Sequence, residues 1–271
     1  MRMVPALFLA CLAALPAAAA DTPAVDVDVA LALVSDVSRS IDDSEFRLQK
    51  QGYAAAFASE HVIAAIRGGV HGAIEVAYIE FASAGEARTV LDWTVIRDAE
   101  GARAFAARLA AAPRSFWGRT AIGGGIALAM RDLADTHAAR QVIDVCGDGT
   151  NNAGRDVAAA RDEAVAAGIT VNGLTITNDH PASWLFAHVQ PPGGLTKYYR
   201  ENVAGGPDSF VLEIHDFQSF GAAMTRKLVN EIAALPQRWF GNRNFPWRST
   251  IATVVPSLRT SYVTDSAGGQ Q

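Results

Sequence analysis

Short apolar runs rich in β-branched residues alternate along this chain with segments of helical periodicity. The runs cover residues 27–34, 74–81, 89–93, 141–146, 169–176 and 209–214. The first of them is almost continuously apolar, which is typical of a strand covered on both faces. Strands that alternate with helices form mostly parallel sheets joined by right-handed crossovers. The sequence therefore predicts a doubly wound α/β fold with helices on both faces of a central sheet.

One pair of runs departs from the parallel pattern. Only residues 82–88 separate the run 74–81 from the run 89–93. A parallel crossover needs a dozen or more residues, so these two strands are expected to be antiparallel. The sheet should then contain one antiparallel strand at its edge.

Helices are marked by apolar residues three or four positions apart, which line one helical face. The clearest sets are Phe46, Tyr53 and Phe57; Ile122, Ile126, Met130 and Leu133; and Phe217, Phe220, Met224, Leu228 and Ile232. Pro and Gly clusters bracket residues 191–207, and we interpret that stretch as a loop before the last strand.

The N-terminal residues 1–20 resemble a signal peptide. Arg2 supplies a positive charge, residues 3–15 form an apolar run, and Ala18-Ala19-Ala20 provides small residues for cleavage. A retained N-terminal anchor and a lipoprotein linked through Cys11 are the alternatives. We expect a folded domain over residues 21–235 and a C-terminal extension, partly disordered, over residues 236–271.

Composition excludes several classes of protein. The formal net charge of the 271 residues is −5, which does not favour a nucleic-acid partner or an anionic membrane surface. No segment after the N-terminal run is apolar enough over about 18 residues to suggest a transmembrane helix. Cleavage would leave Cys146 as a single thiol, which we interpret as a small buried hydrophobic residue. Glu80 lies inside the apolar run 74–81. We expect it to lie on an alternating polar face or to be a paired carboxylate; the alternative is an acid with a perturbed pKa.

Oxygen-bearing side chains follow two of the predicted strands. Asp36, Ser38 and Ser40 follow the first strand, and Asp148 follows the run 141–146. Thr120 precedes the helix that begins near Ile122. Ligands of open α/β sheets bind at the carboxyl ends of the strands, and oxygen-only donors suit Mg²⁺ or Mn²⁺. As an alternative, Ser40 could simply be the N-cap of the following helix.

The ordered segments Asp-Val-Ser-Arg-Ser, Gly-Arg-Thr and Cys-Gly-Asp-Gly resemble the metal-ion-dependent adhesion site (MIDAS) of von Willebrand factor A (vWA) domains. The match falls on Asp36, Ser38, Ser40, Thr120 and Asp148. The chain also resembles a family of uncharacterised bacterial exported proteins with this domain. The resemblance implies a Mg²⁺ or Mn²⁺ site whose open position takes an acidic residue of a protein or peptide partner.

Arg39 and Trp117 could form the rim of such a site. Arg39 lies between two candidate ligands and should point away from the ion, and Trp117 lies just before the Gly-Arg-Thr turn. Trp117 could instead plug the base of the loop. The function implied is an exported binding module and not an enzyme. A metal-stabilised scaffold without a ligand is one alternative. A phosphatase-like hydrolase is another, although it would need an Asp where Ser38 stands.

If the signal peptide is cleaved as its motif predicts, the mature chain begins near Asp21, outside the cytoplasm. The mass of the N-terminal peptide of the native protein measures this directly. A soluble cytosolic protein that retains Met1 would contradict the prediction.

Overall fold

A six-stranded sheet with the order β3-β2-β1-β4-β5-β6 forms the centre of the computed structural model, which describes residues 26–177 and 191–233. All neighbouring strands are parallel except β2 and β3, which are antiparallel. The strands are β1 (Val29–Asp36), β2 (Ile74–Phe81), β3 (Ala87–Ile96), β4 (Gln141–Gly147), β5 (Thr170–Ile176) and β6 (Val211–Ile214). The predicted α/β class and the antiparallel edge strand are confirmed.

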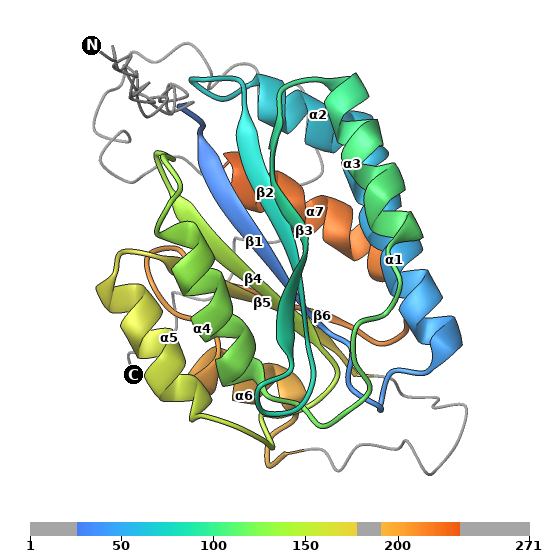
Figure 1. The fold of residues 1–271 in the computed structure, drawn as a ribbon, viewed down its shortest axis with the longest axis vertical. Coiled ribbons are helices and arrows are strands. Elements are labelled where there is room, and N and C mark those ends of the chain that lie inside the picture. The colour runs from blue at the N-terminus through green and yellow to red at the C-terminus, as the bar shows by residue number, and fades with distance from the viewer. Residues whose placement is uncertain (1–25, 178–190, 234–271) are drawn as a thin grey trace, which may run out of the picture.

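Helices cover both faces of the sheet (Figure 1). They are α1 (Asp43–Ala58), α2 (Glu60–Arg67), α3 (Ala99–Ala111), α4 (Ile122–Leu133), α5 (Val157–Ala166), α6 (Leu195–Asn202) and α7 (Phe220–Ala233). Along β1, Val29, Leu31 and Leu33 face the core under α1, α2, α3 and α7. The intervening Ala30, Ala32 and Val34 face the core under α4, α5 and α6. This two-residue alternation with both faces apolar explains the continuous first run.

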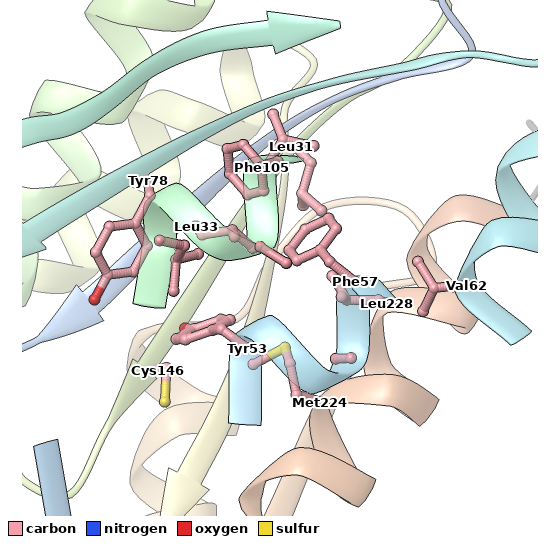
Figure 2. Close-up of a cluster of buried hydrophobic side chains, with 14 of the residues drawn as sticks. Leu31, Leu33, Tyr53, Phe57, Val62, Tyr78, Phe105, Cys146, Met224 and Leu228 are labelled. Atoms are coloured by element: carbon pink, nitrogen blue, oxygen red, sulfur yellow. The ribbon is translucent and has the colours of Figure 1, made fainter. Parts of the chain in front are cut away.

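The core under α1 and α7 is the more aromatic of the two. Figure 2 shows Tyr53 and Phe57 of α1 packed between the sheet and Met224 and Leu228 of α7. The ring centroids of Tyr53 and Phe220 are 5.0 Å apart in an edge-to-face arrangement. The predicted periodic sets of α1 and α7 therefore meet each other on one side of the sheet.

The stretch that we interpreted as a loop, residues 191–207, contains α6, so that prediction is wrong. This helix has eight residues, and its N-cap is Gly194 at φ 87°, with no side-chain cap. Its buried face consists of Leu195, Thr196 and Tyr199, too few apolar residues to produce a helical pattern in the sequence. The sequence predictions for residues 1–20 and 236–271 lie outside the described residues.

A buried ionic group fastens α7 to the sheet. Lys227 Nζ lies 2.9 Å from Asp144 Oδ1 on β4 and also contacts Glu231 Oε1 on its own helix. Asn172 of β5 donates a hydrogen bond of 2.8 Å to Glu231 Oε1. All three charged side chains are fully buried. Two carboxylates and one ammonium leave a net negative charge in the core unless one carboxylate takes up a proton.

Within the described ranges, no helix is long and apolar enough to cross a membrane.

The ionic group should make stability depend on pH. Burial, followed by the charge of Glu231, raises the pKa of Asp144 to about 7, against the lowering effect of Lys227. A raised pKa means that the folded state keeps a proton which the unfolded chain has already released. The free energy of unfolding should therefore fall as pH rises from about 4 to about 7, by at most about 1.4 kcal/mol per pH unit.

Urea unfolding in chelator at several pH values measures this slope. Asp144→Asn should remove most of the decline, because an amide does not titrate. Asp92→Asn, at an exposed position of β3, is the matched control and should keep the wild-type slope. Equal slopes in wild type and Asp144→Asn would refute the assignment of the proton to this group.

Candidate metal site

Asp36 ends β1 at the carboxyl edge of the sheet and is fully buried. Its Oδ1 accepts a hydrogen bond of 2.7 Å from the backbone N–H of Ser38, which closes a tight turn directly after the strand. The N–H of Arg39 donates to the carbonyl of Gly118 at 2.9 Å. The turn after β1 is thereby attached to the segment that precedes Thr120.

The five oxygen-bearing side chains singled out in the sequence come together at this edge. Ser38 Oγ and Ser40 Oγ are 2.9 Å apart, and Thr120 Oγ1 donates to Ser38 Oγ at 3.3 Å. Ser40 Oγ donates to Asp148 Oδ1 at 2.9 Å. With Asp36, which holds the Ser38 N–H, these contacts form one continuous polar cluster. It forms because β1 and β4 are parallel neighbours whose carboxyl ends lie side by side.

The chemistry of the cluster fits a hard divalent cation. Asp36 and Asp148 are 0% and 2% exposed, and three neutral hydroxyls surround them. Two buried carboxylates in one cluster are costly unless a cation balances their charge. Residues 26–177 and 191–233 contain no group of three or more His, Cys, Asp or Glu side chains that could hold an ion, at this edge or elsewhere. The cluster described here differs because hydroxyls supply three of its five groups.

The alternative interpretation of Ser40 as the N-cap of α1 is wrong. The N-cap is Asp42, whose Oδ1 accepts hydrogen bonds from the N–H groups of Ser44 and Glu45 at 2.7 and 2.9 Å. Glu45 Oε2 accepts in return from the Asp42 N–H at 2.9 Å, completing a capping box. The side chain of Ser40 therefore serves the polar cluster and not the helix.

Two asparagines after Asp148 hold the Thr120 segment in place. Asn152 Oδ1 accepts from the Thr120 N–H at 3.0 Å, and the Asn152 N–H donates to the Thr120 carbonyl at 2.8 Å. Asn151 Oδ1 accepts from the N–H of Gly123 in the first turn of α4 at 3.1 Å. Sequence reasoning assigned these residues no role. Their position directly after the Gly147-Asp148-Gly149 turn was the available signal.

Arg114 is a second residue that the sequence did not identify. Its Nη2 donates to the carbonyls of Val37, Ser38 and Ile41 at 2.7, 2.6 and 2.9 Å. One guanidinium thus binds three carbonyls of the turn between β1 and α1, the turn that carries Ser38 and Ser40. Nothing in the local sequence marks Arg114, because the three carbonyls that its Nη2 binds lie more than 70 positions away.

The two candidate rim residues are both exposed. Arg39 is exposed, and the side chain of Trp117 is 53% exposed. The guanidinium carbon of Arg114 lies 3.9 Å from the Trp117 ring centroid, a cation–π contact that supports the ring from one side. Trp117 is thus an exposed ring beside the cluster and does not plug the base of the loop.

Glu80 and Cys146 lie just beneath this edge. Glu80 is fully buried and paired with Lys50 at 3.7 Å, and its Oε2 accepts from the Ser115 N–H at 2.8 Å. Burial lowers the pKa of Lys50 to about 8, although the charge of Glu80 raises it. Cys146 is a fully buried free thiol, as the sequence predicted. Glu80 is therefore a paired structural carboxylate that anchors the segment carrying Trp117.

Comparison with known proteins places the chain in a family. Residues 26–236 match the family model described as "Protein of unknown function (DUF1194)". The chain belongs to this DUF1194 family. No curated protein matches the sequence.

Solved structures with the same fold carry vWA domains. Proximal thread matrix protein 1 from the mussel byssus superposes with a TM-score of 0.55 at 16% identity, over 78% of this chain and 49% of that one. The von Willebrand factor type A protein from Catenulispora acidiphila gives 0.54 at 15% identity, over 76% and 43%. The pilus adhesin SpaC from Lactobacillus rhamnosus GG, in an open conformation, gives 0.52 at 16% identity, over 76% and 30%.

The DUF1194 chain spans about half the length of these proteins, or less. The resemblance to vWA domains inferred from the motifs is confirmed for the fold. One structure of the mussel protein is described as having a zinc-occupied MIDAS motif.

Proposed function

We propose that this DUF1194 protein is an exported, metal-dependent binding module. Asp36, Ser38, Ser40, Thr120 and Asp148 would hold one Mg²⁺ or Mn²⁺ ion, directly or through water. The observation that carries the proposal is the continuous polar cluster at the carboxyl edge of the sheet. Its two buried carboxylates are joined through Ser38 and Ser40, and the Thr120 hydroxyl bonds to Ser38 Oγ. The mussel protein of the same fold, with zinc in its MIDAS motif, supports a divalent ion at this place.

The charge of the cluster favours an acidic partner. Two protein carboxylates balance the charge of a divalent ion and add no excess negative charge. An incoming carboxylate can therefore still bind the ion favourably. The exposed Arg39 and Arg119 flank the cluster. The backbone N–H of Arg39 donates to the carbonyl of Gly118, the residue before Arg119, so the two arginines lie near each other. Together with Trp117 they would present a cationic and aromatic rim. We propose a protein or peptide partner that supplies an Asp or Glu to the ion.

We assign no catalytic step to the site. In this proposal all five residues serve the ion and none acts as a nucleophile or base, and Ser38 stands where a phosphatase would need a second Asp. Turnover of a phosphate or ester substrate that disappears in Asp148→Ala would contradict this assignment. We place the mature protein in the periplasm or outside the cell, on the basis of its N-terminal sequence, and the N-terminal mass described above tests it.

Metal binding is the first test. Calorimetric titration of the mature protein with MnCl₂ or MgCl₂ should give one site, and Asp36→Ala should abolish it because a buried carboxylate is lost. The ion should also stabilise the fold, by about 2.7 kcal/mol at a concentration 100 times its Kd. Asp92→Ala, at an exposed position, is the control and should bind like wild type. Equal affinity in wild type and Asp36→Ala would refute the site.

Partner binding is the second test. The immobilised mature protein should retain a partner from an envelope extract in Mg²⁺ and lose it in chelator or as Thr120→Ala. Arg39→Ala should weaken binding by about 5-fold or less, since exposed ion pairs contribute ~0–1 kcal/mol. Trp117→Ala should reduce the free energy of partner binding by about 2 kcal/mol or more, as the loss of an aromatic anchor commonly does.

Two results would separate the alternatives. A partner retained equally in chelator would show that recognition uses another face. Metal binding by the protein without any metal-dependent partner would favour the scaffold alternative.

A further inference from the structure

Tyr199 lies on the buried face of α6, the helix that the sequence did not reveal. Its side chain is fully buried, and its ring belongs to the core under α4, α5 and α6. The phenolic hydroxyl makes no hydrogen bond in the described part of the chain. A buried hydroxyl without a partner is unfavourable, and at neutral pH a phenol is a hydrogen-bond donor. The Tyr199 hydroxyl therefore needs a hydrogen-bond acceptor.

Two glycines on the sheet show where the Tyr199 side chain runs. A Cβ added to Gly173 of β5 would lie 2.9 Å from Tyr199 Cδ1, so the ring crosses β5 where a side chain is missing. A Cβ added to Gly147, the last residue of β4, would lie 2.6 Å from the Tyr199 hydroxyl and 3.1 Å from Asp36 Oδ2. The hydroxyl and the Asp36 carboxylate therefore converge on the same point, above Gly147.

The strand register explains this convergence. Gly173 is paired with Val145, two residues before Gly147, and Val145 faces the core that contains Tyr199. Asp36 follows Val34 by two residues on β1, so it faces the same side. Glycine at both positions leaves room on the sheet for the Tyr199 side chain, which extends from α6 toward the carboxylate.

We propose that Tyr199 is a positioning residue of the metal site. Its hydroxyl donates a hydrogen bond to the Asp36 carboxylate, directly or across one water, when the ion is bound. Asp36 Oδ1 is already oriented by the Ser38 N–H. A donor on the Oδ2 side would fix the whole carboxylate, and such supporting donors commonly change metal affinity 10- to 100-fold. This inference rests on the proposed metal site and adds a residue to it.

The test compares two tyrosine variants by Mn²⁺ titration calorimetry of the mature protein. Tyr199→Phe keeps the ring and should weaken Mn²⁺ binding about 10-fold or more, with the one-site stoichiometry retained. Tyr78→Phe is the matched control, since Tyr78 is equally buried and lies in the other core, away from the Asp36 carboxylate. Unfolding in chelator measures the loss of stability in each metal-free variant.

A purely structural role would lower stability in chelator and leave Mn²⁺ affinity unchanged, which would overturn the inference. Gly173→Ala provides a second variant, because it displaces the ring without touching a proposed ligand. It should weaken Mn²⁺ binding, whereas Gly124→Ala, whose added Cβ meets only the Ala121 side chain at 3.9 Å, should not. Wild-type affinity in both Tyr199→Phe and Gly173→Ala would refute the role of Tyr199.

Two further results distinguish this inference from the proposed function. If wild type binds Mn²⁺ and Asp36→Ala does not, the metal site stands whatever Tyr199→Phe shows. If wild type binds neither Mn²⁺ nor Mg²⁺, both proposals fail.

Discussion

The parallel pairing of β1 with β4 is the constraint on which the candidate site depends. Parallel strands end at the same edge, so Asp36 at the end of β1 and Asp148 just after β4 lie close although 112 positions separate them. Their carboxylates become members of one buried cluster, joined through Ser38 and Ser40. Buried like charges in such a cluster favour a cation, and this electrostatic requirement leads to the proposed function.

Residues that are not candidate ligands hold this arrangement. Arg114 gathers three carbonyls of the turn after β1, Asn152 brackets Thr120 from both sides, and Tyr199 approaches Asp36 from α6. On the opposite face, the buried Lys227 group fastens α7 to β4 two residues before Cys146. The turns of the site and the packing of α7 on the sheet therefore both depend on polar partners that are distant in the chain.

Local patterns of apolar residues in the sequence were enough to predict most of the strands and helices. Continuous apolar runs predicted the strands within about two residues for β1, β2, β4, β5 and β6, and a seven-residue connection predicted the antiparallel edge strand. Apolar spacing marked α1, α4 and α7. Alanine-rich or polar helices such as α5 and α6 gave weaker patterns, because the faces that they bury contain small residues or a single tyrosine.

The sequence by itself determined the α/β class and the five candidate ligands, since strand periodicity is a local property and each of the three short motif segments can be recognised on its own. Only the tertiary structure decided that Asp42 and not Ser40 caps α1, that Trp117 is exposed, that Arg114 and Asn152 hold the segments of the site, and that the Tyr199 hydroxyl lies near Asp36. Each of these depends on contacts between segments that come together only when the sheet assembles. No periodicity within one segment encodes such contacts.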